Sequence, residues 1–175
     1  MKKLLVLFAG LVGAVSCVPF SRNIMDQVDP TLAFGVVQKD PSAFQGKTVL
    51  WGGIIVETLN RADETLIKVR QTDLDYQTRP TNLDRSQGRF LIQYIGFLDP
   101  AIYKDGREIT VAGQITGKEV FPLGNLQYTY PVVTAKEIYL WEIMIPYRPF
   151  YPPWYYGPYY PWWGYRPYGP YPYWW

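Results

Sequence analysis

The thiol of Cys17 is the side chain whose chemistry the sequence singles out most clearly. The chain of 175 residues holds no other cysteine and no histidine. This composition excludes an internal disulfide, a histidine-based catalytic triad and a histidine metal site. Carboxylate, hydroxyl, lysine and tyrosine groups remain available for chemistry.

The residues before Cys17 have the anatomy of an export signal. Lys2 and Lys3 precede an apolar run, residues 4–15, and small residues lead from this run to the cysteine. A helix that spans a bilayer needs roughly 20 apolar residues, so the run is interpreted as a signal peptide rather than as an anchor. We therefore predict that residues 1–16 are removed.

Cleavage before Cys17 leaves two possible fates for its thiol. Small residues directly before a cysteine resemble the lipobox of bacterial lipoproteins, although Ala14 stands where that pattern usually has a branched aliphatic residue. The alternative is ordinary cleavage of the same bond, which would release a soluble protein with a free thiol. A free thiol without a partner would be reactive, so we favour lipid attachment at Cys17. In the lipoproteins that this pattern resembles, a residue such as Val18 in place of an aspartate favours sorting to the outer membrane.

The acidic residues that could act in catalysis or bind a metal have simpler structural interpretations. Asp99 precedes Pro100, which is typical of a helix cap or a turn. Asp73 and Asp75 could offer oxygens to calcium, with Asp84 further along the same stretch, but their spacing is not that of an EF-hand loop. We therefore predict no catalytic residue, no metal, no cofactor and a protein that is not an enzyme.

The balance of charge argues against nucleic acid as a partner. Loss of Lys2 and Lys3 with the signal would leave 15 basic residues against 15 acidic ones. Proteins that bind along phosphate backbones carry an excess of basic residues, and the chain without its signal would have no such excess.

The apolar pattern predicts a small all-β domain over residues 40–145. The predicted strands cover residues 48–56, 65–70, 89–95, 108–117 and, as a fifth strand or two short ones, 128–133 and 138–144. A short helix is expected after Asp99, between the third and fourth strands, and residues 72–88 are expected to form a long surface loop. This order predicts a five-stranded Greek-key barrel of the OB type, with an open β-sandwich as the main alternative. Residues 17–39 lack a sustained period and are interpreted as the lipidated N-terminus and a tether.

Several blocks of sequence keep a distinctive order and spacing. They are Gly46-Lys47-x-Val49-x-Trp51-Gly52-Gly53-Ile54-Ile55, Gly88-Arg89-Phe90-Leu91, Phe97-Leu98-Asp99-Pro100-x-x-Tyr103-x-x-Gly106-Arg107-x-Ile109-Thr110-Val111-x-Gly113, Tyr128-x-Tyr130-Pro131-Val132-Val133 and Leu140-Trp141. These blocks resemble the Slp family of outer-membrane lipoproteins, named for starvation-inducible lipoproteins of Gram-negative bacteria. The resemblance implies a place in the outer membrane and no catalytic residues.

The C-terminal segment, residues 146–175, has an unusual composition of ten tyrosines, nine prolines, five tryptophans, three glycines, two arginines and one phenylalanine. The frequent prolines exclude a helix or a central strand and favour extended polyproline-II segments. Three roles stay open, in which the aromatic rings lie on a lipid surface, bind peptidoglycan or another envelope glycan or protein, or fold back over the domain. The candidate contact residues are Trp154, Tyr155, Tyr156, Trp162, Trp163, Trp174 and Trp175.

Together these features predict a non-enzymatic lipoprotein that is anchored in the bacterial outer membrane by acylated Cys17. Its domain is expected on the periplasmic face, with a scaffolding or stress-related role at the envelope surface. The alternative is an OB-like module that binds an envelope glycan or a small molecule. A concave surface lined by tryptophan and tyrosine would favour the binding module, and a smooth, fully packed barrel would favour the scaffold.

Overall fold

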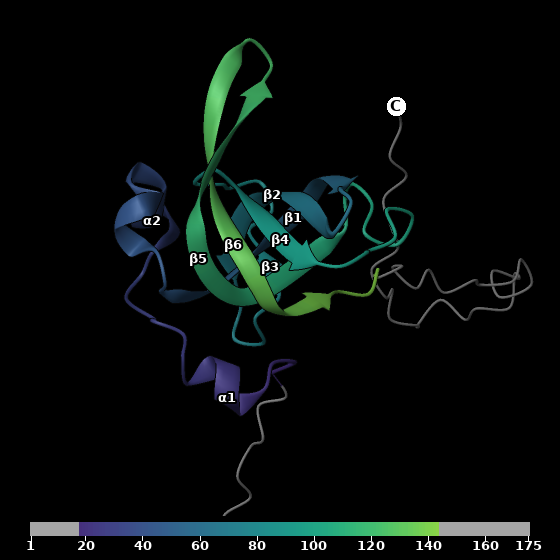
Figure 1. Ribbon diagram of the computed structural model, residues 1–175. Helices are drawn as coiled ribbons and strands as arrows, with labels where there is room; N and C mark the ends of the chain where they lie inside the picture. The colour runs from purple at the N-terminus through teal and green to yellow at the C-terminus, as the bar shows by residue number, and fades with distance from the viewer. Residues whose placement is uncertain (1–17, 144–175) are drawn as a thin grey trace, which may run out of the picture. The chain divides into compact units, whose positions relative to one another are not determined.

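Five long strands close into a barrel in the computed structural model, which describes residues 18–143 (Figure 1). The strands are β1 (Thr48–Asn60), β2 (Glu64–Leu74), β4 (Arg89–Ile95), β5 (Glu108–Leu123) and β6 (Leu126–Leu140). β1 pairs with both β2 and β5, β6 lies between β5 and β4, and β4 pairs with β2. Only the β4–β6 pair is parallel among these, and the two-residue strand β3 (Pro80–Thr81) extends the sheet beside β2. The predicted all-β barrel is confirmed, whereas its finer assignment to the OB type stays a prediction.

The alternation within the strands places one set of side chains inside the barrel. On β2, Ile67 and Val69 point into the main core, as alternation of faces along a strand requires. Aromatic rings pack edge-on at the centre, where the ring of Trp51 lies 5.0 Å from that of Phe34 and 5.4 Å from that of Phe90. Edge-to-face pairs of this kind add to the apolar burial that stabilises the barrel.

Gly53 allows β1 to approach its neighbouring strands closely. Gly53 lies opposite Gln71 on β2 and Ile109 on β5, so the barrel closes at this position. A Cβ atom on Gly53 would lie 2.0 Å from the carbonyl oxygen of Arg70, which no side chain can accommodate. The glycine is therefore required by close backbone approach.

The hairpin of β5 and β6 is longer than the sequence pattern predicted. The strands predicted from the sequence end at residue 117 and resume at residue 128, which leaves the residues between them outside any strand. Instead β5 continues to Leu123, and only Gly124 and Asn125 connect it to β6. The register shifts between Ile115 and Gly117, and beyond this bulge the hairpin projects from the barrel as an arm (Figure 1).

The short helix predicted between the third and fourth long strands is a single turn. The Asp99 carboxylate accepts a hydrogen bond from the backbone N–H of Ala101 at 2.8 Å, and its carbonyl accepts from Ile102 and Tyr103. The capping bond of Asp99 was therefore predicted correctly, but it closes a single turn and no helix follows it before β5. The chain does not continue as a helix because Gly106, with a φ of 81°, turns it towards β5.

Several residues before the boundary predicted at residue 40 pack against the barrel. Two short α-helices, α1 (Arg22–Met25) and α2 (Phe34–Lys39), precede a 3-10 turn, η1 (Pro41–Phe44). Phe34 and Val37 are buried in the main core, and Phe20 and Ile24 form part of a second apolar cluster. Helices of four and six residues are too short to show a sustained period, which explains why the segment was interpreted as a tether. Within residues 18–143, no helix is long and apolar enough to cross a bilayer.

Replacement of Thr78 by glycine is expected to stabilise the fold by about 1 kcal/mol. Thr78 has a φ of 68°, and its buried Oγ1 has no hydrogen-bond partner among the described residues. Glycine adopts this φ without strain and carries no hydroxyl, while the Thr78 carbonyl would still accept from Thr110 Oγ1. Chemical denaturation measures the change. The matched substitution Thr81→Gly, on β3, is expected to destabilise the fold. An equal loss of unfolding free energy in both variants would contradict the stabilisation expected for Thr78→Gly.

Candidate functional site

The residues predicted to contact the membrane or a partner lie outside the described part of the chain. These are Cys17 and the tail residues Trp154, Tyr155, Tyr156, Trp162, Trp163, Trp174 and Trp175. The structure does describe the chain that directly follows Cys17 and the whole surface of the barrel. The candidate site is therefore built from these two parts.

The chain that follows Cys17 packs directly on the outside of the barrel. The apolar cluster at this place consists of Val18, Phe20, Ile24, Met25, Leu50 and Ala112. The backbone N–H of Ser21 donates to Glu137 Oε2 at 2.9 Å, and the Ser21 hydroxyl hydrogen-bonds the same carboxylate. Ser21 also caps α1, since its Oγ accepts from the N–H of Ile24. The packed residues thus include Val18, which directly follows the predicted lipid attachment.

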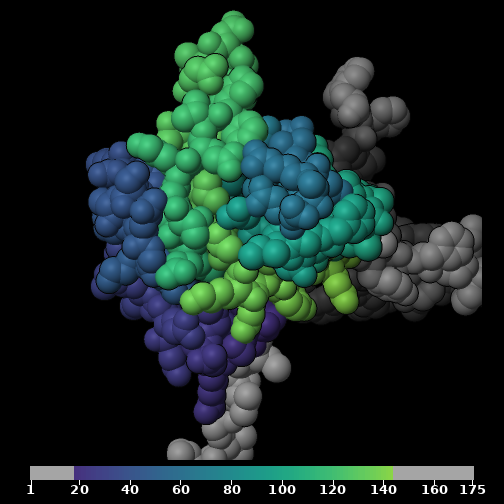
Figure 2. Space-filling view, in the orientation of Figure 1, coloured from purple at the N-terminus to yellow at the C-terminus, as the bar shows by residue number. Residues whose placement is uncertain are grey.

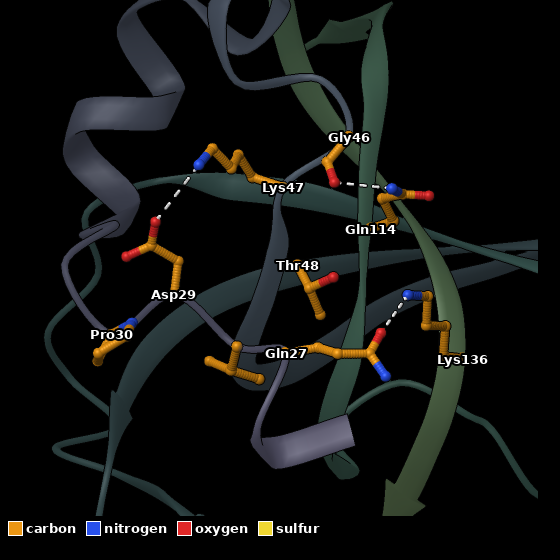
Figure 3. Close-up of a pocket in the computed structure, with 9 residues that line it drawn as sticks. Gln27, Asp29, Pro30, Gly46, Lys47, Thr48, Gln114 and Lys136 are labelled. Atoms are coloured by element: carbon orange, nitrogen blue, oxygen red, sulfur yellow. Dashed lines mark hydrogen bonds and ion pairs between the residues drawn. The ribbon is translucent and has the colours of Figure 1, made fainter. Parts of the chain in front are cut away.

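A shallow pocket of about 560 Å³ lies beside α1, between the N-terminal segment and strands β1, β5 and β6 (Figure 3). Its lining residues are Gln27, Val28, Asp29, Pro30, Gly46, Lys47, Thr48, Gln114 and Lys136. Lys136 Nζ donates to Gln27 Oε1 at 2.9 Å, and Lys47 Nζ lies 3.8 Å from Asp29 Oδ2. Hydrogen bonds from the Thr31 hydroxyl and backbone N–H, together with Lys47, hold the pKa of Asp29 below its ordinary value. The pocket is polar and presents two ammonium groups.

A second shallow pocket of about 420 Å³ lies at the base of the β5–β6 arm. Its lining residues are Ser42, Gln45, Gln93, Thr116, Gly117, Lys118, Glu119 and Val132. Neither this lining nor that of the first pocket includes an aromatic ring on which a sugar or a base could stack. The two pockets can therefore offer hydrogen bonds and charge, but no stacking surface.

A charged network runs beside the second pocket and should make stability depend on pH. Gln93 and Arg61 both donate to the carboxylate of Glu64, and these bonds hold the pKa of Glu64 below its ordinary value of 4.5. Arg61 also pairs with Glu119, at 3.0 Å. The network ties the turn between β1 and β2 to the arm.

Acid is expected to remove the stabilisation that Glu64 provides. A lowered pKa in the folded state stabilises the fold above the ordinary pKa, and this contribution is lost as the pH falls through the folded-state value. Thermal unfolding at about pH 7 and about pH 3 measures how much free energy of unfolding each protein loses in acid. This loss should be smaller in Glu64→Gln than in the parent. The difference should be less than about 1 kcal/mol, because the carboxylate is partly exposed. The control Glu142→Gln should behave like the parent. An acid-induced loss in Glu64→Gln as large as that of the parent would contradict the assignment.

The outer face of β2 and β4 is occupied by the chain's own side chains. The arm contributes Phe121, Tyr128 and Tyr130, which pack with Leu91 and Val132. The Tyr128 hydroxyl accepts from the backbone N–H of Arg89 at 3.0 Å and from Gln38. Lys68 Nζ lies 4.6 Å from the centre of the Phe121 ring. This face is a packed surface and not an open groove.

The candidate acidic residues serve local structure. Asp75 Oδ1 accepts from the backbone N–H groups of Gln77 and Arg79, so it closes the turn between β2 and β3. Asp73 accepts from the Asn82 side chain, and Asp84 is exposed. Within residues 18–143 no three histidine, cysteine, aspartate or glutamate side chains cluster in a way that could hold a metal ion.

Sequence reasoning missed both the docking of the N-terminal segment and the pocket with two lysines. The spacings Phe20 to Ile24 and Phe34 to Val37 are those of one helix face, and they were the available signal. The pocket offered no comparable signal, because Gln27 and Lys136 are 109 residues apart in the chain.

The chain has clear relatives of known sequence. The model of the Outer membrane lipoprotein Slp family matches residues 14–173. The outer membrane protein Slp of Escherichia coli K12 is 27% identical over 147 residues, which cover 84% of this chain and 78% of that protein. The uncharacterized lipoprotein YeaY of the same strain is 32% identical over 125 residues, covering 69% of this chain and 64% of that protein. A protein of Haemophilus influenzae is 37% identical over 102 residues, covering 58% of this chain and 55% of that protein. The chain therefore spans less than two thirds of the length of the last two relatives.

The fold and the docked N-terminal segment define a class of protein, a small closed β-barrel with the segment that follows a cysteine packed on its outer surface. The family match supplies the particular assignment. This chain belongs to the Outer membrane lipoprotein Slp family, because the family model covers most of its length. The resemblance seen in the sequence blocks between residues 40 and 141 is thereby confirmed.

Proposed function

We propose that this protein is a non-enzymatic lipoprotein of the outer membrane, anchored by acylated Cys17, that serves as a scaffold at the periplasmic surface. The observation that carries the proposal is the family match over residues 14–173, which includes Cys17 and the small residues before it. The relatives named outer membrane protein and lipoprotein support the location and the anchor. Several acyl chains on one cysteine would make attachment nearly permanent, since each buried CH₂ contributes about 0.8 kcal/mol.

A scaffolding role is supported over ligand binding by the surface of the barrel. The outer face of β2 and β4 is filled by Phe121, Tyr128 and Tyr130 of the protein's own arm. The two pockets are shallow and have no aromatic lining residue. By the criterion that follows from the sequence, a packed outer face and two pockets without an aromatic lining residue, within residues 18–143, favour the scaffold.

The tail would supply a second contact for the anchored protein. Residues 146–175 contain fifteen tyrosine and tryptophan side chains, which suit a lipid headgroup layer, peptidoglycan or another envelope component. Anchoring at Cys17 keeps the tail close to the envelope, so even a weak contact would be populated through effective concentration.

A comparison of two soluble chains tests the role of the tail. Both begin at Val18, and one ends at Trp175 and the other at Ile145. We expect the longer chain to sediment with lipid vesicles or with purified cell-wall sacculi, and the shorter chain to lose that binding. Loss with vesicles alone would assign the tail to the membrane, and loss with sacculi alone would assign it to the glycan. Sedimentation of neither chain would contradict a contact role for the tail.

A further inference from the structure

We propose that the barrel is seated directly on the bilayer through the end that carries α1, with the pocket of Lys47 and Lys136 against the phosphates of lipid headgroups. In this orientation the β5–β6 arm points away from the membrane. The inference rests on the proposed acylation of Cys17 and goes beyond it, because a lipid anchor alone does not fix how a domain faces the membrane.

The chain provides no spacer between the proposed lipid at Cys17 and the packed residues that begin with Val18. Consecutive Cα atoms lie about 3.8 Å apart, so the Cα atom of Cys17 is within this distance of that of Val18. Val18 already packs in the cluster with Phe20 and Ile24, and Ser21 is held to Glu137 by two hydrogen bonds. A flexible tether would need residues free of such contacts. The acyl chains would therefore leave the protein at the surface of the barrel.

The chemistry of the pocket beside α1 supports the same orientation. Gln27, in the pocket wall, follows the last residue of α1 by two positions, and Figure 3 shows the pocket beside that helix. The Lys47 side chain is 60% exposed, and Lys136 is also exposed. Asp29 is the one acid among the lining residues, and Lys47 lies beside it.

This combination suits a phosphate group at the surface of a bilayer. Two lysine ammonium groups supply charge. Gln114 Nε2 donates one N–H to the Gly46 carbonyl and has a second N–H that a phosphate oxygen could accept. Each lysine close to an anionic lipid surface strengthens association by about fivefold. A shallow, open shape is what a headgroup that remains part of its membrane requires.

The direction of the β5–β6 arm supports the same orientation. In Figures 1 and 2 the β5–β6 arm projects from the end of the barrel opposite α1. Its exposed aliphatic side chains include Val120 and Leu126, which are 55% and 71% exposed. When α1 rests on the bilayer, these side chains face the periplasmic space rather than the lipid.

Two fluorescent probes on the acylated, full-length protein test the orientation. Asn23→Cys places a label on α1, and Asn125→Cys places one in the turn of the arm, since both residues are exposed. The proteins are inserted into vesicles that carry a nitroxide at the lipid headgroup. We expect the label at residue 23 to lose most of its fluorescence and the label at residue 125 to keep it. Equal quenching at both positions, or no quenching at residue 23, would overturn the proposal.

A charge variant tests the contact of the pocket with headgroups. In vesicles of phosphatidylcholine, adding phosphatidylglycerol should increase quenching at residue 23, and Lys47→Gln combined with Lys136→Gln should remove this increase. The matched control combines Lys104→Gln with Lys118→Gln, two exposed lysines elsewhere on the barrel, and should keep it. An increase that persists without Lys47 and Lys136 would overturn the headgroup contact.

The outcome separates this inference from the proposed anchor. The mass of the purified protein shows first whether Cys17 carries acyl chains. Acylated protein with an unquenched label at residue 23 would refute the seating and leave the lipoprotein assignment intact. Protein without acyl chains would refute the proposed anchor, and the seating that rests on it.

Discussion

Replacement of Cys17 by serine is expected to remove the protein from the outer membrane and to abolish the incorporation of palmitate. A serine hydroxyl cannot take the thioether-linked lipid, and without acyl chains the barrel has no strong means of attachment. The amount recovered with outer membranes should fall by more than about tenfold, because each acyl chain contributes many buried CH₂ groups. Density separation of membranes after labelling with palmitate measures both effects.

The control for this experiment keeps the cysteine and changes its neighbour. Ser16→Ala retains a small residue before Cys17 and should be labelled and sorted like the parent. Cys17→Ser that is recovered with outer membranes in parental amounts would show that attachment does not depend on lipid. The aromatic tail would then become the principal candidate for the anchor.

Replacement of Gly53 by alanine is expected to destabilise the barrel by about 3 kcal/mol or more. The new Cβ atom would lie 2.0 Å from the Arg70 carbonyl oxygen and 2.8 Å from its carbonyl carbon. These are backbone atoms in the β1–β2 ladder, so they cannot rotate away as the end of a side chain can. The barrel would have to open at the position where β1 pairs with both β2 and β5. Chemical denaturation of the two proteins measures the loss.

Gly35 provides the matched control for this substitution. A Cβ atom at Gly35 would meet the side-chain oxygen of Gln87 at 2.8 Å, and that flexible side chain can move. Because alanine also favours helix, Gly35→Ala in α2 should stay within about 1 kcal/mol of the parent. Similar stability of Gly53→Ala and the parent would show that β1 and β2 are not as close as described.

The strands of the barrel were predictable because their residues alternate. On β2 the alternation predicts Ile67 and Val69 on one face and Leu66, Lys68 and Arg70 on the other. In the structure Ile67 and Val69 lie in the main core, and Leu66 is also buried, outside that core. The arm was not predictable in the same way. Its cross-strand pairs include Phe121 with Tyr128 and Pro122 with Gln127. A proline within an apolar pattern argues against a strand, so the sequence pattern indicated a loop there.

The packing of the N-terminal segment against the barrel was not predicted, for a different reason. Its contribution to the fold comes from a few apolar side chains in helices of one or two turns, such as Phe34 and Val37. Such short elements are stabilised by the tertiary contacts they make and carry little periodic signal of their own. The tether was therefore inferred from the absence of a pattern, which does not distinguish an unpacked segment from a short packed one.

The two parts of the candidate site, Cys17 and the lysine pocket, also differ in how far the sequence predicted them. Cys17 could be singled out because its chemistry depends on residues adjacent in the chain. The lysine pocket could not, because Lys47 and Lys136 come from distant segments that only the closed barrel brings together. The two lysines could be recognised as part of one pocket only from the arrangement of the strands in the structure.

The mass of the N-terminal peptide of the mature protein, isolated from membranes, tests the central claim most directly. The account predicts a peptide that begins at Cys17 and carries the added mass of acyl chains. A peptide that begins at Cys17 with a free thiol would show ordinary signal cleavage, and the anchor as well as the seating of the barrel on the bilayer would be contradicted.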